Sequence, residues 1–234
     1  KIFANGDFCL SEEESAMVDA VKKNFTRVIV VMNVGGMVDT SWFVHEDAIG
    51  AVLMAWQGGM EGGLAAAELL VGKGNPSGKL SDTFAQTLED YPSTGDFHES
   101  KDYVNYTEDI YVGYRYFETV PGADKKVNYP FGYGLSYTSF AIRNCCGRLE
   151  KAEDGTQIVV EASVTNVGKL AGKEVVQLYY SAPQGRLGKP ARALGAFAKT
   201  RCLQPGETQQ VTLRLAADSM ASYDDTGKIA KSAY

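Results

Sequence analysis

The chain has 234 residues, enough for two ordinary domains, and its 44% hydrophobic and 22% charged content is typical of globular proteins rather than disordered or fibrous ones. The formal net charge is -6 and Lys and Arg are scattered, which argues against a nucleic-acid or anionic-membrane surface. The longest apolar runs are strand-sized, far short of the roughly 20 residues of a membrane span. We therefore expect neither nucleic acid nor membrane as a partner.

The first part of the chain alternates helix-like and strand-like patterns. Residues 11–25 are expected to form a helix, because Ser11 and Glu14 make a capping box and apolar residues then recur at helical spacing. Residues 27–34 are an almost continuous β-branched run, which predicts a parallel strand buried on both faces. Residues 51–56 predict a second buried strand.

Further helices and a long irregular region follow. Residues 39–49 are compatible with a short helix, and residues 60–71 with a helix that starts at a glycine turn. This succession of strand and helix predicts an α/β layered domain. Residues 92–130 are rich in Tyr and show little periodicity, which is typical of a loop that carries function or wraps another domain.

From about residue 140 the pattern becomes that of an all-β domain. Apolar and mostly polar residues alternate over 158–165, 176–180 and 211–215, with turns between these segments. Such strands predict a β-sandwich, and the missing Cys-Trp-Cys signature favours the fibronectin over the immunoglobulin type. A further turn is expected at residues 224–227, after which the last strand is expected to be missing.

Cysteine and histidine offer little chemistry in this sequence. Only His45 and His98 are available beside the cysteines, so no zinc or other metal site is expected. Free thiols are expected, because no Cys-x-x-Cys spacing occurs and sequence neighbours rarely bridge; this favours a cytoplasmic compartment. The four cysteines are Cys9, Cys145, Cys146 and Cys202.

Motifs for nucleotide binding and serine hydrolysis are not met. A P-loop ending at Lys79 would need glycine at Lys73 and Ser or Thr at Leu80. The glycines of residues 58–63 do not fit G-x-G-x-x-G, and Glu61 would repel a pyrophosphate, so close packing of helix on sheet explains them better. No G-x-S-x-G elbow occurs.

Carboxylates remain, because glycoside hydrolysis needs two of them flanking one bond. A helix cap or a surface ion pair explains Asp39 and Glu61. Glu108 and Asp109 lie among tyrosines, and carboxylates beside aromatic rings suit sugars, whose C–H faces stack and whose hydroxyls hydrogen-bond. A tyrosine-rich contact between domains is the alternative interpretation of this stretch.

Several strings resemble the second and third domains of family-three glycoside hydrolases, in the family's order and over nearly the whole chain. The strings are 56–63 (WQGGMEGG), 75–80 (NPSGKL), 106–116 (YTEDIYVGYRY), 131–137 (FGYGLSY), 165–168 (TNVG) and 172–179 (GKEVVQLY). The resemblance implies a retaining enzyme that cleaves terminal β-linked glucose or related sugars without a cofactor. The nucleophile would be an aspartate on a (β/α)-barrel domain. The acid/base would be a glutamate in a loop just before the stretch that matches residues 8–11.

Neither catalytic carboxylate has a counterpart in this sequence, so we place no catalytic residue in this chain and expect it to be inactive alone. Residues 1–139 would be the later part of the α/β sandwich domain with a Tyr-rich wrapping loop. Residues 140–234 would be a fibronectin type III-like β-sandwich lacking its last strand. The expected partners are a β-linked glucoside or oligosaccharide and the barrel domain of the same polypeptide, which would lie on either side of this piece.

Substrate contacts within the chain are predicted at four residues of the Tyr-rich stretch. A sheet opened at an inner strand would also expose backbone donors and apolar surface, so self-association through the sheet edge is expected. A non-catalytic module that binds carbohydrate or protein is the alternative function. The four candidate substrate-binding residues are Glu108, Asp109, Tyr111 and Arg115.

Overall fold

The computed structural model describes residues 5–96, 100–153, 155–223 and 229–230, and the chain divides into two compact units. Unit 1 comprises Lys1–Gly74 and Leu80–Tyr133, and unit 2 comprises Asn75–Lys79 and Gly134–Tyr234. The units therefore interleave along the sequence, while the domain boundary at residues 139 and 140 stays a prediction. No helix in the described part of the chain is long and apolar enough to cross a membrane.

Helix α1 (Glu12–Asn24) begins at the capping box that the sequence predicts. The Glu14 amide donates to the Ser11 hydroxyl at 3.2 Å, and the Ser11 amide donates to the Glu14 carboxylate at 2.8 Å. These bonds satisfy amides that have no partner inside the helix. Near the other end, Lys22 pairs with Glu46 at 2.6 Å, which ties α1 to the loop before β2 (Ile49–Met54).

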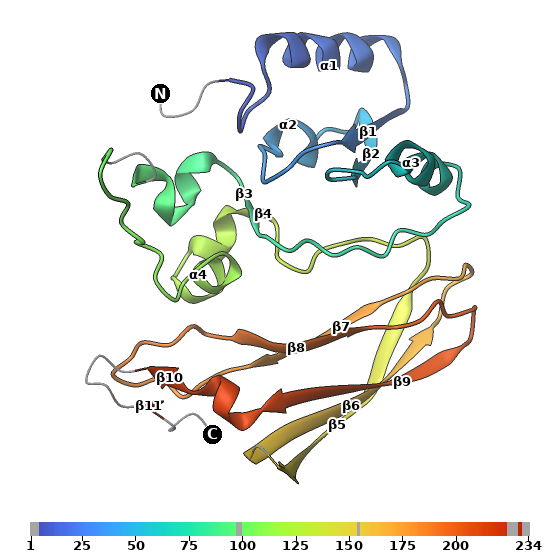
Figure 1. Ribbon diagram of the computed structural model, residues 1–234. Helices are drawn as coiled ribbons and strands as arrows, with labels where there is room; N and C mark the ends of the chain where they lie inside the picture. The colour runs from blue at the N-terminus through green and yellow to red at the C-terminus, as the bar shows by residue number, and fades with distance from the viewer. Residues whose placement is uncertain (1–4, 97–99, 154, 224–228, 231–234) are drawn as a thin grey trace. The chain divides into compact units, whose positions relative to one another are not determined.

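A parallel pair of strands forms the sheet of unit 1, as expected. β1 (Val28–Met32) runs beside β2, with α2 (Ser41–Val44) between them in sequence and α3 (Gly62–Leu70) after them (Figure 1). The expectations that β1 is buried on both faces and that β2 is a buried strand are both wrong. No residue of β2 is buried. In β1, Val28 and Met32 are buried, but Ile29 is 56% and Val31 42% exposed, because no described element of the chain covers that face.

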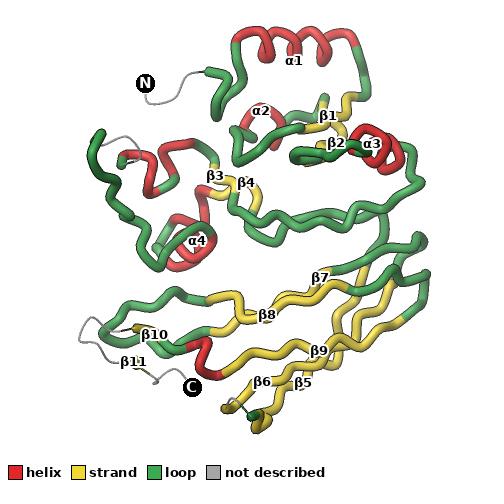
Figure 2. The backbone as a smooth tube through the Cα atoms, viewed as in Figure 1, coloured by secondary structure: helices red, strands yellow, loops and turns green. Residues whose placement is uncertain are grey.

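The rest of unit 1 is mostly irregular, and Figure 2 shows long loops there. The stretch of residues 92–130 nevertheless contains short helices that its lack of periodicity did not predict. A small core of Ala85, Phe117 and Ala123 holds this part together. Its elements are β3 (Phe84–Ala85), η1 (Leu88–Asp90), η2 (Pro92–Gly95), α4 (Tyr114–Thr119), η3 (Ala123–Lys126) and β4 (Val127–Tyr129), with β3 antiparallel to β4.

Unit 2 is a β-sandwich, so the predicted class of α/β followed by a fibronectin type III-like sandwich is confirmed. One sheet has the antiparallel order β5-β6-β9, and the other is the antiparallel pair β7-β8 (Figure 1). The expected turn at residues 224–227 lies outside the described residues. The elements are β5 (Phe140–Ala152), β6 (Gly155–Asn166), β7 (Val175–Tyr180), β8 (Ala193–Lys199), β9 (Thr208–Ala216), η4 (Ala217–Met220), β10 (Ser222–Tyr223) and β11 (Ile229–Ala230).

Alternating residues of both sheets fill the sandwich core. Val164 of β6 and Leu213 of β9 pack with Val176 of β7. Two residues of the mostly polar set depart from the predicted alternation, because Ser163 is buried and Val159 is fully buried. Ser163 accepts hydrogen bonds from Asn144 and Gln210, and the burial of Val159 is explained by its neighbours. Val159 pairs directly with Arg148 on β5 and Arg214 on β9, and we attribute its burial to the aliphatic stems of these side chains.

Asn166 at the end of β6 is fully buried and makes four hydrogen bonds. Its amide nitrogen donates to the carbonyls of Leu170 and Leu203, both at 2.8 Å. Its side-chain oxygen accepts from the Thr138 hydroxyl at 2.8 Å and from the Gly168 amide at 3.1 Å. The side chain therefore joins three separate segments of unit 2 with no hydrogen-bonding capacity left over.

The 75–79 segment joins unit 2 through two side chains. Asn75 donates to the Ala171 carbonyl at 2.8 Å and accepts from the Ser136 hydroxyl at 2.9 Å. Lys79 pairs with Glu174 at 3.0 Å and donates to a backbone carbonyl at 2.7 Å. These contacts give a structural reason for the Asn and Lys of the NPSGKL string.

Candidate functional site

A pocket of about 760 Å³ lies in unit 1, where four separate stretches of its chain meet, one of them the loop between β1 and α2 that carries Met37. Of the other three, one precedes α1, one surrounds β3 and the short helices η1 and η2, and one leads into α4. No Lys, Arg or His occurs among the lining residues that the structure describes. They are Asp7, Phe8, Met37, Asp82, Thr83, Leu88, Tyr91, Ser93, Thr94, Glu108, Val112 and Gly113.

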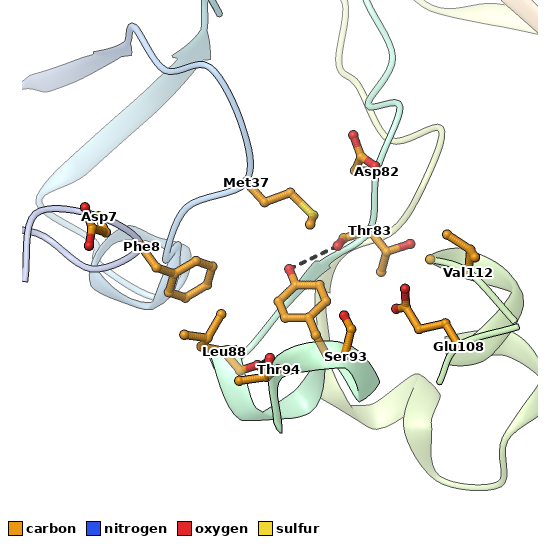
Figure 3. Close-up of a pocket in the computed structure, with 12 residues that line it drawn as sticks. Asp7, Phe8, Met37, Asp82, Thr83, Leu88, Ser93, Thr94, Glu108 and Val112 are labelled. Atoms are coloured by element: carbon orange, nitrogen blue, oxygen red, sulfur yellow. Dashed lines mark hydrogen bonds between the residues drawn. The ribbon is translucent and has the colours of Figure 1, made fainter. Parts of the chain in front are cut away.

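The pocket has a polar end around Glu108 and an opposite end, named the apolar end, where Phe8 and Leu88 lie on the same side as Asp7 and Thr94. Figure 3 shows the Glu108 carboxylate turned toward Thr83 and Ser93. Phe8 and Leu88 lie together on the other side of the view. A ligand that fills this space would therefore meet the carboxylate and hydroxyl groups around Glu108 at one end, and the hydrocarbon of Phe8 and Leu88 beside two further polar residues at the other.

Two groups at the polar end, the Glu108 carboxyl and the Thr83 hydroxyl, have few or no hydrogen-bond partners within the protein. Burial raises the pKa of the Glu108 carboxyl, and a hydrogen bond with Ser93 only partly opposes this. Thr83 is 2% exposed, and its buried hydroxyl has no hydrogen-bond partner. Buried polar atoms are almost always paired, so an unpaired hydroxyl in a pocket wall is a feature that a ligand can explain.

Tyr91 belongs to the framework of the pocket and not to its free hydrogen-bonding groups. Its hydroxyl accepts from the Ala85 amide at 2.8 Å and donates to the Thr83 carbonyl at 3.1 Å. Burial raises the pKa of this phenol, so it stays neutral. The ring packs edge-to-face with Phe8 at 6.3 Å and with Phe117 at 5.9 Å, which fixes one wall of the pocket.

Of the four predicted substrate-binding residues, Glu108 lines the pocket and the other three are not among its lining residues. Asp109 is exposed and has a left-handed backbone with φ 47°. The Tyr111 amide donates to the Glu108 carbonyl at 2.8 Å, closing a turn. The Arg115 guanidinium lies over the Tyr114 ring, 5.9 Å from its centre. The structure thus does not gather the four residues around this pocket.

The other candidate residues that the structure describes do not line this pocket. The carboxylate of Asp39 accepts from the Ser41 amide at 2.8 Å and the Ser41 hydroxyl at 2.9 Å. The N-cap residue of α2 is Thr40, which makes no side-chain capping bond, so the interpretation of Asp39 as a helix cap or surface ion pair stays a prediction. Glu61 is exposed and sits at the start of α3 without a capping bond. His45 is exposed, and His98 lies outside the described residues.

Sequence reasoning missed the groups that surround Glu108. Thr83 lies before the Tyr-rich region of residues 92–130 and Ser93 lies at its start, and single Ser and Thr residues in loops carry no signal of a site. Only the folded chain brings their hydroxyls to one carboxylate.

Comparison with known families identifies both parts of the chain. Residues 4–137 match the glycosyl hydrolase family 3 C-terminal domain, and residues 174–232 match the fibronectin type III-like domain. The first match covers more than half of the chain. The chain therefore belongs to glycosyl hydrolase family 3.

Similar proteins agree with this family. The chain is 63% identical to "Beta-glucosidase A" of Butyrivibrio fibrisolvens, over 100% of this chain and 30% of that protein, and 46% identical to a Ruminococcus albus "Beta-glucosidase", over 95% and 22%. A solved β-glucosidase from Paenibacillus barengoltzii matches with TM-score 0.90 and 53% identity, over 96% of this chain and 24% of that one. The chain thus spans less than a third of these relatives.

Proposed function

We propose that this chain is part of a retaining β-glucosidase-type hydrolase that cleaves terminal β-linked glucose or related sugars. The observation that carries the proposal is the 63% identity, over the whole chain, to a protein named as a β-glucosidase. A solved structure of β-glucosidase 3B from Thermotoga neapolitana in complex with glucose aligns with 94% of this chain, with a TM-score of 0.84. The substrate would accordingly be a β-linked glucoside or oligosaccharide.

We further propose that the chain does not catalyse the reaction alone. It spans 30% of the Butyrivibrio relative, so most of that protein has no counterpart here. The Asp39 carboxylate accepts hydrogen bonds from Ser41, and Glu61 is exposed on the surface. Retention requires two carboxylates about 5–5.5 Å apart across the scissile bond. Both would come from outside this chain, and the barrel domain of the same polypeptide would be its partner.

The decisive experiment is release of nitrophenol from nitrophenyl β-D-glucoside by this chain and by a longer parent polypeptide that contains it. Activity in the parent only is the expected result. Turnover by the chain alone would overturn the proposal of incompleteness and direct mutagenesis to Glu108 and Asp109. No turnover by either protein on any β-glucoside would overturn the proposed activity itself.

A module that binds carbohydrate without catalysis is the second candidate, and the exposed tyrosines favour it. Tyr106 is 91% exposed, and Tyr103 is exposed nearby, as expected of rings that stack on sugars. Titration with cello-oligosaccharides, followed by calorimetry, would test this role. Replacing Tyr111 or Glu108 by Ala should weaken binding if the predicted substrate contacts exist, and leave it unchanged otherwise.

The open sheet of unit 1 supports a proposal of self-association. Ile29 and Val31 on β1, with Met17 on α1 and Phe25 just after it, expose large apolar side chains. Exposed apolar side chains mark interaction surfaces or aggregation-prone sites where they form a contiguous patch. Sedimentation velocity over a range of concentrations should show reversible association of the isolated chain. A monomer at all concentrations would contradict it.

A further inference from the structure

The pocket around Glu108 has the features of a binding site whose ligand is not a neutral sugar. Glu108, Asp82 and Asp7 all line it, while no basic residue is among the described residues of its wall. The Glu108 carboxylate is partly buried with the Ser93 hydroxyl as its partner. A carboxylate withdrawn from water is strongly stabilised by a paired cation, and a neutral ligand leaves that charge uncompensated.

The distance between the acidic groups favours an extended organic cation over a metal ion. Among the described residues, no three acidic, His or Cys side chains come close enough together to hold a metal ion. A compact metal ion would need them gathered around one point. A cation of greater extent, with several N–H donors, can reach carboxylate and hydroxyl groups placed apart in the wall.

The apolar side chains of the pocket favour a ligand that carries hydrocarbon next to its charged group. Phe8, Met37 and Leu88 line the pocket together with the polar groups, and Figure 3 shows Phe8 and Leu88 away from Glu108. Arginine-type side chains combine an aliphatic stem with a charged head and commonly bury the stem along apolar surface. The planar guanidinium also offers five donors in a fork that matches a carboxylate.

We propose that this pocket binds a guanidinium group carried on an aliphatic stem, with Glu108 as the carboxylate that pairs with it. The orphan hydroxyl of Thr83, beside Glu108, accepts a further N–H after a small rotation of its side chain. The stem lies against Phe8, Met37 and Leu88.

The first test uses the unaltered 234-residue chain and a pair of matched small molecules. Butylguanidine and butylurea have nearly the same shape, but only the first is charged at pH 7. Calorimetric or NMR titration should give saturable binding of butylguanidine at least about tenfold tighter than butylurea, and weaker at high salt. Equal binding of the two compounds, or none by either, would overturn the proposal. Binding of methyl β-glucoside in their place would make this a sugar site.

Variants then assign the charge to one residue. Glu108→Gln keeps the shape of the side chain and should weaken butylguanidine binding by about tenfold or more. Asp109→Asn is the matched control, because this neighbouring carboxylate is exposed and is not among the lining residues; its binding should stay within about twofold. Equal loss in both variants would indicate nonspecific attraction and would overturn the assignment. Thr83→Val gives an independent measure, with a smaller loss expected.

The source of the guanidinium is distinguished by repeating the titration on the longer parent polypeptide. If an arginine of the parent occupies the pocket, butylguanidine should bind this chain and not the parent. If the pocket serves a separate peptide or a small guanidino compound, both proteins should bind it. Either result supports the site and names the source, while failure of both proteins to bind would overturn it. Nitrophenyl glucoside hydrolysis is measured separately, so the two proposals fail independently.

Discussion

Replacing Asn166 by Asp is expected to destabilise unit 2 severely at neutral pH, although the two side chains have nearly the same shape. The amide nitrogen of Asn166 donates to the carbonyls of Leu170 and Leu203 inside the sandwich. A carboxylate would place negative oxygen against carbonyl oxygen at this fully buried position. The side chain would therefore be held protonated, in which state it can donate only one of the two bonds.

The size of the effect follows from these two losses. Holding the carboxyl protonated costs about 4 kcal/mol at pH 7 and about 1.5 kcal/mol at pH 5, because each pKa unit is worth ~1.4 kcal/mol and free Asp titrates near ~3.9. The carbonyl without a donor adds about 1–3 kcal/mol. Asn166→Asp should thus lose about 5–7 kcal/mol at pH 7, a large share of the ~5–15 kcal/mol typical of natural proteins.

The stability of the Asn166→Asp variant should fall as pH rises. The folded pKa of the new carboxyl is raised above its unfolded value, so the folded state holds the proton more tightly. The stability of the variant is therefore fully retained below the ordinary carboxyl range and is lost as pH rises. Relative to the native chain, Asn166→Asp should regain about 2.5 kcal/mol between pH 7 and pH 5.

Urea unfolding at pH 5 and pH 7, followed by far-UV circular dichroism, measures the effect. Both tryptophans, Trp42 and Trp56, belong to unit 1, so their fluorescence reports on unit 1 in the same samples. The matched control is Asn33→Asp, because Asn33 is exposed; it should change stability by less than about 0.5 kcal/mol. A loss below about 2 kcal/mol at pH 7 for Asn166→Asp, without pH dependence, would refute the four-bond role of Asn166.

Three further predictions follow from single contacts. Lys79→Met breaks the partly buried pair with Glu174 and should lower the urea stability of unit 2 by about 2 kcal/mol, whereas an unchanged midpoint would contradict a structural role for the 75–79 segment. Because burial raises the pKa of Glu108, the native chain should lose thermal stability relative to Glu108→Gln as pH rises through the carboxyl range; parallel melting profiles would argue against burial of this charge. Ser11→Ala should cost about 1 kcal/mol and speed amide exchange in the first turn of α1, while the exposed control Ser15→Ala should not.

Local features of the fold were predictable from sequence, because their causes are local. Ser11 and Glu14 are three residues apart, and their mutual bonds depend on little else. The parallel strands and the alternating strands of the sandwich follow from side-chain periodicity in the same way. The burial of Ile29 and Val31 was wrongly predicted, because hydrophobicity states a preference while exposure depends on which elements cover the face.

The candidate site was predictable only in part. Glu108 was selected because it lies among tyrosines, and the structure places it in a pocket. The same reasoning selected Asp109, Tyr111 and Arg115, which are not among the lining residues. Neighbours in sequence within an irregular segment point in different directions, so proximity along the chain does not define a shared site. The hydroxyl of Thr83 became relevant only through the fold.

The 75–79 segment also constrains how unit 2 is completed. Its hydrogen bonds join Asn75 to Ser136 and Ala171, which are 61 and 96 residues further along the chain. On a ribosome, Asn75 emerges long before these partners exist, and residues 80–133 must fold as a loop closed at both ends. Closing a flexible loop of 55 residues, the separation of Lys79 and Gly134, costs about 3.5 kcal/mol of chain entropy before any contact forms. Prior folding of residues 80–133 reduces that cost, so this part of unit 1 acts as a spacer that brings the two ends together.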